Sequence, residues 1–97
     1  MPTYVTLVHY TEQGVKTFKD LPARLEDTRS SGEALGARLI AFYLTMGQYD
    51  AVVISEAPND EAVAKLALAA GGRGNVRTET FRAFTEDEAT RLAAELS

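Results

Sequence analysis

A few side chains along this sequence have the chemistry to act at a functional site. His9 is the only histidine among the 97 residues, and an imidazole can act as a general base because its pKa lies near neutrality. No acid partner for it is evident in the sequence, and one histidine alone does not form a metal site. A lone histidine of this kind is more often a hydrogen-bonded residue at the edge of a core. The catalytic residues therefore stay unknown, and His9 is the first candidate if the protein is an enzyme.

A tyrosine-containing turn supplies the next candidates. The segment Gly47-Gln48-Tyr49-Asp50 separates two apolar runs and predicts a β-hairpin, in which Gly47 adopts a positive φ and Asp50 binds backbone amides. The alternative is that Tyr49 and Asp50 line a cleft at the end of a sheet. There a hydroxyl and a carboxylate could orient a small polar metabolite, with Tyr43 on the preceding strand as a further candidate.

Strand four carries a pair of opposite charges. Alternation places Arg77, Glu79 and Phe81 on one face of this strand. If that face lies at an interface between two copies, Arg77 and Glu79 can pair across it, or the Arg77 guanidinium can hold a small carboxylate. If the face is exposed to solvent, the pair contributes little.

The sequence gives little support for a nucleotide site, a thiol-based site or a metal site. The glycine-rich segment Gly71-Gly72-Arg73-Gly74 follows a predicted helix and precedes a strand, whereas a phosphate-binding loop requires the opposite order. The sequence contains no cysteine, which excludes disulfides, thiol catalysis and thiolate metal sites. We expect no cofactor and no metal.

The elements that must position these residues are short and alternate along the chain. Strands are predicted over 4–10, 38–45, 51–56 and 75–84. A helix capped by Thr11 is expected to break or kink at Pro22, and Asp20 can cap its second half before Gly36 ends it. A second helix spans about 58–72, and Thr85 with Glu88 forms a capping box for a last helix. This order predicts a ferredoxin-like βαββαβ α+β fold with a four-stranded antiparallel sheet and a C-terminal helix.

The strands are apolar on both faces. Strand one places Val5 and Leu7 on one face and Tyr4 and Val8 on the other, while strand two is predicted to place 39, 41 and 43 opposite 40, 42 and 44. Two helices cover only one face of a sheet, so the second apolar face needs another partner. The simplest solution is a homodimer, or a higher homo-oligomer, that packs sheet against sheet as a dimeric α+β barrel. Part of the last helix covering that face is the alternative.

Length and charge limit the remaining possibilities. Ninety-seven residues are enough for a single domain, 1–97, without a second module. The net charge of −4, with arginines scattered among acids, argues against a nucleic-acid partner. Neither a signal peptide nor a membrane span is evident in the sequence, so we expect a cytoplasmic protein with no membrane partner.

Several segments together resemble a known family. They are Tyr4-Val5-Thr6-Leu7, Tyr43-Leu44-Thr45-Met46-Gly47-Gln48-Tyr49-Asp50, Glu56-Ala57-Pro58 and Gly74-Asn75-Val76-Arg77-Thr78-Glu79-Thr80. They resemble the GYD domain family, small bacterial and archaeal proteins of unassigned activity. A looser similarity links the hairpin and the Asn-Val-Arg-Thr run to the effector-binding domains of Lrp/AsnC-type regulators, which imply a ferredoxin-like dimer that binds amino acids at its interfaces. The stress-responsive dimeric barrel monooxygenases are a third analogue, at the level of the fold alone.

Two functions remain open at this point. The first is a non-catalytic oligomeric module that binds a small polar metabolite or another protein. The second is a cofactor-free enzyme, monooxygenase-like or isomerase-like, that uses His9 with Tyr43 or Tyr49. We favour the module, because the sequence shows neither a nucleophile–base pair nor a metal cluster.

Overall fold

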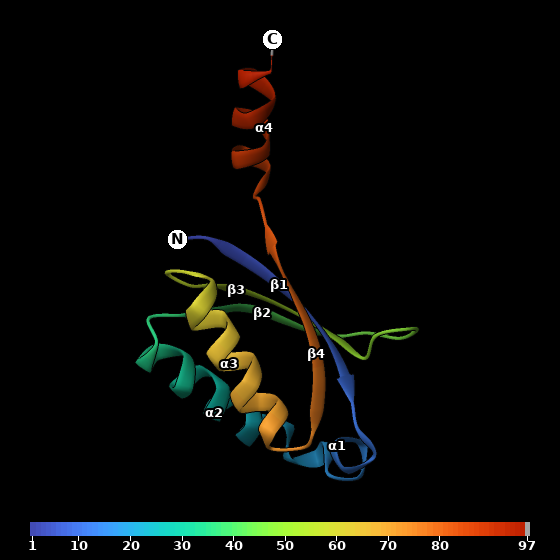
Figure 1. Ribbon diagram of the computed structural model, residues 1–97. Helices are drawn as coiled ribbons and strands as arrows, with labels where there is room; N and C mark the ends of the chain where they lie inside the picture. The colour runs from blue at the N-terminus through green and yellow to red at the C-terminus, as the bar shows by residue number, and fades with distance from the viewer. Residues whose placement is uncertain (97) are drawn as a thin grey trace.

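The computed structural model describes residues 1–96 and contains a four-stranded sheet with helices on one of its faces (Figure 1). The elements in chain order are β1 Thr3–Tyr10, α1 Glu12–Lys16, the 3-10 helix η1 Phe18–Asp20, α2 Leu21–Ala34, β2 Arg38–Leu44, β3 Ala51–Glu56, α3 Asp60–Gly72, β4 Val76–Ala83 and α4 Glu86–Glu95. The strands lie in the order β2-β3-β1-β4, and every neighbouring pair is antiparallel. The predicted ferredoxin-like α+β fold is confirmed.

Side-chain caps define where three of the helices begin. The Thr11 side chain accepts a hydrogen bond from the Gly14 amide, and Asn59 does the same for the Ala62 amide. At α4, Thr85 and Glu88 form the predicted capping box, each side chain accepting a bond from the other's backbone N–H. Because these caps satisfy amides that lack partners within the helix, the starts of α1 and α4 could be predicted from sequence. The sequence predicts the second helix from about residue 58, and α3 begins at Asp60 after the Asn59 cap.

The break between the first two helices lies earlier than Pro22. α1 ends at Lys16, the 3-10 turn η1 follows, and α2 begins at Leu21 with Pro22 in its first turn. Proline is tolerated there because its missing N–H would have no partner within the helix. Asp20 takes the N-cap position as predicted, but its side chain makes no capping hydrogen bond.

A bulge in β2 changes which residues share a face of the sheet. Leu39 pairs with Ser55 but Ala41 pairs with Ile54, so Ile40 is the extra residue. Leu39 consequently lies on the helix side with Phe42, whereas Ala41 lies on the opposite face. The prediction that residues 39, 41 and 43 share one face is therefore wrong for Leu39, because simple alternation does not hold across a bulge.

The packed core is small and composed mostly of short side chains. Tyr4, Ala37, Ala57, Ala62 and Val63 form one buried cluster between the sheet and α3. The Tyr4 hydroxyl donates a 2.5 Å hydrogen bond to Asp60 Oδ1, which joins β1 to the start of α3. That bond, reinforced by burial, raises the pKa of Tyr4. The rest of the layer between sheet and helices is less well filled, and this leaves room for a cavity.

α4 projects away from the rest of the molecule (Figure 1). It continues the direction of β4 beyond the edge of the body and does not cover the sheet face that α2 and α3 leave open. Its contact with the body includes a 3.6 Å ion pair between Arg82 and Glu88. The last helix therefore does not supply the missing cover for the second apolar face within its own chain.

Candidate functional site

The open face of the sheet carries a continuous apolar surface. Register places the side chains of all four strands in common rows across it, because residues directly opposite one another in antiparallel strands point to the same side. We call the following set the open-face patch: Val5, Leu7, Ala41, Tyr43, Val52, Ile54 and Phe81. Phe81 is 49% exposed and Tyr43 is 61% exposed, values that are high for large rings on a sheet.

Asp50 fastens the β2–β3 hairpin to β1. Its Oδ2 accepts a 2.8 Å hydrogen bond from the Tyr10 amide, and its own amide donates a 2.8 Å bond to the Val8 carbonyl. The turn itself is closed by the Thr45 amide, which donates to the Asp50 carbonyl, and Gly47 has the expected positive φ of 107°. The Asp50 carboxylate thus already has a backbone partner, although in β1 rather than within the turn.

A polar cluster lies beside the open-face patch at the hairpin end of the sheet. The rings of His9 and Tyr49 are 4.8 Å apart, centroid to centroid, and tilted by 45°. In the strand register, Arg77 on β4 lies directly opposite His9 on β1. Glu79 lies two residues further along β4, on the same face. Interaction of the Tyr49 hydroxyl with the Glu79 carboxylate raises the pKa of Tyr49. We call His9, Tyr49, Arg77 and Glu79 the hairpin-end cluster.

The structure brings together some of the sequence candidates and separates others. His9, Tyr49 and Arg77 meet in the hairpin-end cluster, while Tyr43 lies on β2 opposite Val52. The sequence indicates Glu79 only as a partner of Arg77. In the structure, Glu79 is also a neighbour of Tyr49. The cluster lies on an exposed face, where an imidazole, a phenol, a guanidinium and a carboxylate can form hydrogen bonds and ion pairs with a second molecule.

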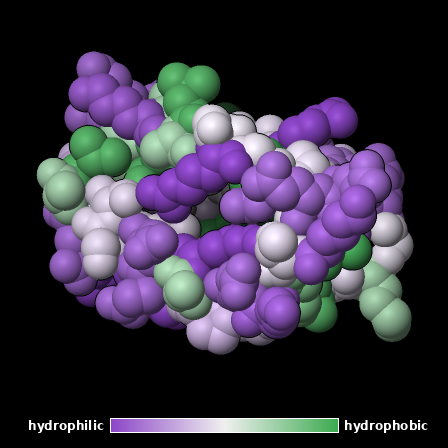
Figure 2. Space-filling view, turned by 90° about the horizontal axis from the view of Figure 1, so that it is seen from below, coloured by the Kyte–Doolittle hydropathy of each residue, from purple (hydrophilic) through white to green (hydrophobic). Residues whose placement is uncertain are grey.

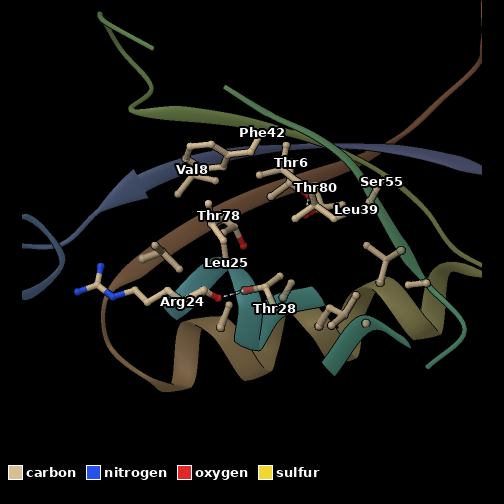
Figure 3. A pocket seen from close by; sticks show the side chains of 18 of the residues that line it. Thr6, Val8, Arg24, Leu25, Thr28, Leu39, Phe42, Ser55, Thr78 and Thr80 are labelled. Atoms are coloured by element: carbon tan, nitrogen blue, oxygen red, sulfur yellow. Dashed lines mark hydrogen bonds between the residues drawn. The ribbon is translucent and has the colours of Figure 1, made fainter. Parts of the chain in front are cut away.

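A second feature, which sequence reasoning missed, is a cavity of about 150 Å³ between the sheet and the helices α2 and α3. Figure 3 shows its walls, with Val8, Phe42, Thr78 and Thr80 on the sheet and Leu25 on α2. The view from below in Figure 2 shows a hollow with hydrophobic atoms inside and mostly hydrophilic side chains around it. Threonines at alternate positions of β4 were the available signal, because a strand face that packs against helices is usually aliphatic.

Two polar groups at one end of this cavity are set apart from its apolar lining. The Tyr10 hydroxyl is buried and has no hydrogen-bond partner within residues 1–96, and burial raises the pKa of Tyr10. The Arg24 guanidinium donates to the Thr17 carbonyl at 2.7 Å, to the Thr17 hydroxyl and to the Gly14 carbonyl at 3.5 Å. Among the described residues, it forms no ion pair with a carboxylate.

The described part of the chain has neither a cluster of metal-ligating side chains nor a helix that could cross a membrane. Residues 1–96 contain no group of three or more histidine, cysteine, aspartate or glutamate side chains placed to hold a metal ion. Within the same residues, no helix combines the length and apolar character that crossing a membrane requires.

Comparison with known proteins gives a relative, a structural neighbour and a family. The glutamine synthetase and cystathionine beta-lyase binding protein of Thermus thermophilus is 34% identical over 85 residues, which cover 87% of this chain and 90% of that protein. The crystal structure of FFRP-DM1 matches with a TM-score of 0.55 over 87% of this chain and all of the other. At 17% identity, this match shows a shared fold alone. The GYD domain model matches residues 4–93, nearly the entire chain. The protein is a member of the GYD domain family.

Proposed function

We propose that this protein is a homo-oligomeric interaction module, in which two copies assemble through the open faces of their sheets and the assembly binds other proteins. The observation that carries the proposal is the open-face patch, which is apolar, central in the sheet and uncovered by any helix of the described chain (Figure 1). Monomeric proteins rarely leave such a surface exposed to water.

The charges beside the patch favour a second copy as its occupant. Arg77 and Glu79 both lie exposed on the open face, and a two-fold axis can bring each side chain toward the partner's opposite charge. The same surface can therefore be complementary to itself, with apolar residues in the middle and paired charges at the rim. Sheets that pack in this way lie about 10 Å apart, which leaves side chains such as Phe81 buried between them.

Protein binding by the assembly is supported by the relative from Thermus thermophilus, whose name describes a protein that binds two enzymes. At 34% identity over most of both chains, we propose that this chain also binds protein partners. The hairpin-end cluster is the proposed contact, because it gathers four polar side chains at one end of the sheet. Tyr49 and Arg77 of this cluster, together with Tyr43 and Asp50, remain the proposed ligand-binding set.

Light scattering with two matched variants tests the assembly. We expect the wild-type protein at micromolar concentration to have at least twice the 10.5 kDa mass of one chain. Phe81→Glu places a charge in the open-face patch and should give a monomer. Leu68→Glu makes the same kind of change at a side chain on α3 that is 75% exposed and lies away from the patch, so it should leave the mass unchanged. A monomeric wild-type protein contradicts the proposal.

Binding to partners is tested separately by biolayer interferometry. Immobilised protein is exposed to the glutamine synthetase and to the cystathionine β-lyase of its own organism, each purified, with serum albumin as a negative control. We expect saturable binding to at least one enzyme, weakened by Tyr49→Ala. If neither enzyme binds, these partners are wrong for this chain, whatever its oligomeric state.

A further inference from the structure

The cavity between the sheet and the helices has the features of a small-molecule site, and it lies within a single chain. Its walls come from the helix-facing sides of the strands and from α2 and α3 (Figure 3). An enclosed apolar cavity of about this volume in other proteins admits a molecule the size of benzene, and the cavity here opens to the surface as the hollow in Figure 2. The volume of about 150 Å³ is therefore of the size that such a ligand needs.

Several of the polar groups in its walls already have partners. The hydroxyls of Thr6 and Thr80 bond to each other at 3.0 Å, and the Thr28 hydroxyl donates to the Arg24 carbonyl at 2.9 Å. These threonines therefore do not call for a polar ligand in the interior. The body of the ligand in this part of the cavity should be apolar, because an unpaired polar group would lose its hydrogen bonds to water there.

One end of the cavity differs. The Tyr10 ring packs edge-on against Phe18 of η1, with centroids 5.4 Å apart, and Arg24 reaches the adjacent Thr17. Tyr10 and Arg24 both line the cavity, and the Arg24 guanidinium lies at the end away from Thr80 and Ser55 (Figure 3). A buried hydroxyl without a partner among the described residues and a cation without a carboxylate among them thus occur together.

We propose that this cavity binds a small monocarboxylate with a compact apolar body, such as an aromatic or branched aliphatic acid. The Tyr10 hydroxyl is closed off in this structure, so binding requires the Tyr10 ring to turn toward the ligand. The carboxylate would then accept a hydrogen bond from that hydroxyl and face the Arg24 guanidinium, an arrangement in which charge-assisted bonds are strong. The apolar body would lie beside Thr78 on the sheet and Ala67 on α3, which also line the cavity. The site is independent of the proposed dimer, since one chain supplies every residue that lines it.

A titration followed by amide chemical shifts tests the site with three probes. Sodium benzoate combines the charge with an aromatic body, benzyl alcohol keeps the body without the charge, and acetate keeps the charge without the body. We expect benzoate to saturate by about 10 mM, with shifts concentrated in β1, β4, α2 and α3. Acetate and benzyl alcohol should each bind at least about tenfold more weakly, because acetate lacks the apolar body and benzyl alcohol lacks the charge.

Three variants locate the binding. Tyr10→Phe removes only the hydroxyl and should weaken benzoate about fivefold to tenfold. Ala67→Leu extends into the cavity and should abolish binding. Ala69→Leu makes the same change on the exposed side of α3 and should leave the affinity unchanged. Circular dichroism and thermal melts confirm that each variant is folded.

The outcomes separate clearly. Absence of saturable benzoate binding to the folded wild-type protein overturns the proposal, as does equal loss of binding in Ala67→Leu and Ala69→Leu. Equal affinity for benzoate and benzyl alcohol overturns the assignment of a carboxylate. None of these results depends on the mass measured by light scattering, so failure of the dimer and failure of this site can be told apart.

Discussion

Replacing Gly14 with alanine should destabilise the protein through one close backbone contact. A Cβ atom built on Gly14 would lie 2.0 Å from the carbonyl oxygen of Asn75, whereas real contacts of this kind are not shorter than 3.0 Å. α1 and the start of β4 must therefore move apart by about 1 Å. The Asn75 carbonyl also accepts a 3.0 Å hydrogen bond from the Thr11 amide, so the movement strains that bond.

The magnitude follows from three terms. Overpacking costs about 1–3 kcal/mol, and a weakened hydrogen bond costs about 1 kcal/mol more. The better helix propensity of alanine offsets about 0.5–1 kcal/mol. We expect a net loss of about 1–3.5 kcal/mol, which lowers Tm by roughly 4–28 °C for a chain of this size. Because Arg24 also donates to the Gly14 carbonyl, the change should disturb the cavity end as well.

Gly71→Ala is the matched control. It makes the same substitution in α3, at a position where an added Cβ meets no atom within 4 Å. We expect it to stabilise the protein by up to about 1 kcal/mol. Urea and thermal unfolding of both variants at one fixed protein concentration measure the difference. A Gly14→Ala protein that is as stable as the wild type would refute the close contact between α1 and Asn75.

Three further variants probe contacts elsewhere in the fold. Tyr4→Phe removes the bond to Asp60 and should cost about 1.5–3 kcal/mol in urea unfolding. Because the folded-state pKa of Tyr4 is raised, its contribution is fully present below about pH 10 and is lost at higher pH, so the fall in wild-type stability above that pH should be smaller in Tyr4→Phe. Thr85→Ala removes the cap of α4 and should cost about 1 kcal/mol locally, seen as faster amide exchange in α4 with little change in Tm. Asp50→Ala leaves the Tyr10 amide without its side-chain acceptor and should cost about 1–3 kcal/mol, measured by thermal unfolding.

Much of the fold could be predicted because local sequence determines it. The predicted caps at Thr11 and Thr85 and the positive φ of Gly47 each depend on a few neighbouring residues. The bulge at Ile40 could not be predicted, because it depends on how β2 pairs with β3 rather than on composition. A register shift of one residue is invisible to counting alternate positions.

The candidate site was predicted in part for the same reason. Alternation placed Arg77 and Glu79 on one face, and the register agrees with that placement. The closeness of His9 and Tyr49 depends on the hairpin folding back toward β1, which no local pattern specifies. The cavity depends on how far α2 and α3 stand from the sheet, and this distance is set by packing between elements that are distant in sequence.

The most direct measurement of the proposed assembly is an isotope-filtered NOE experiment on a mixture of ¹³C-labelled and unlabelled protein, which detects contacts between copies only. We expect intermolecular NOEs from the methyl groups of Val5, Leu7 and Ile54 and from the Phe81 ring, all in the open-face patch. Intermolecular NOEs that arise from α2 and α3 instead, or none at a concentration where the protein is oligomeric by light scattering, would contradict assembly through the open face of the sheet.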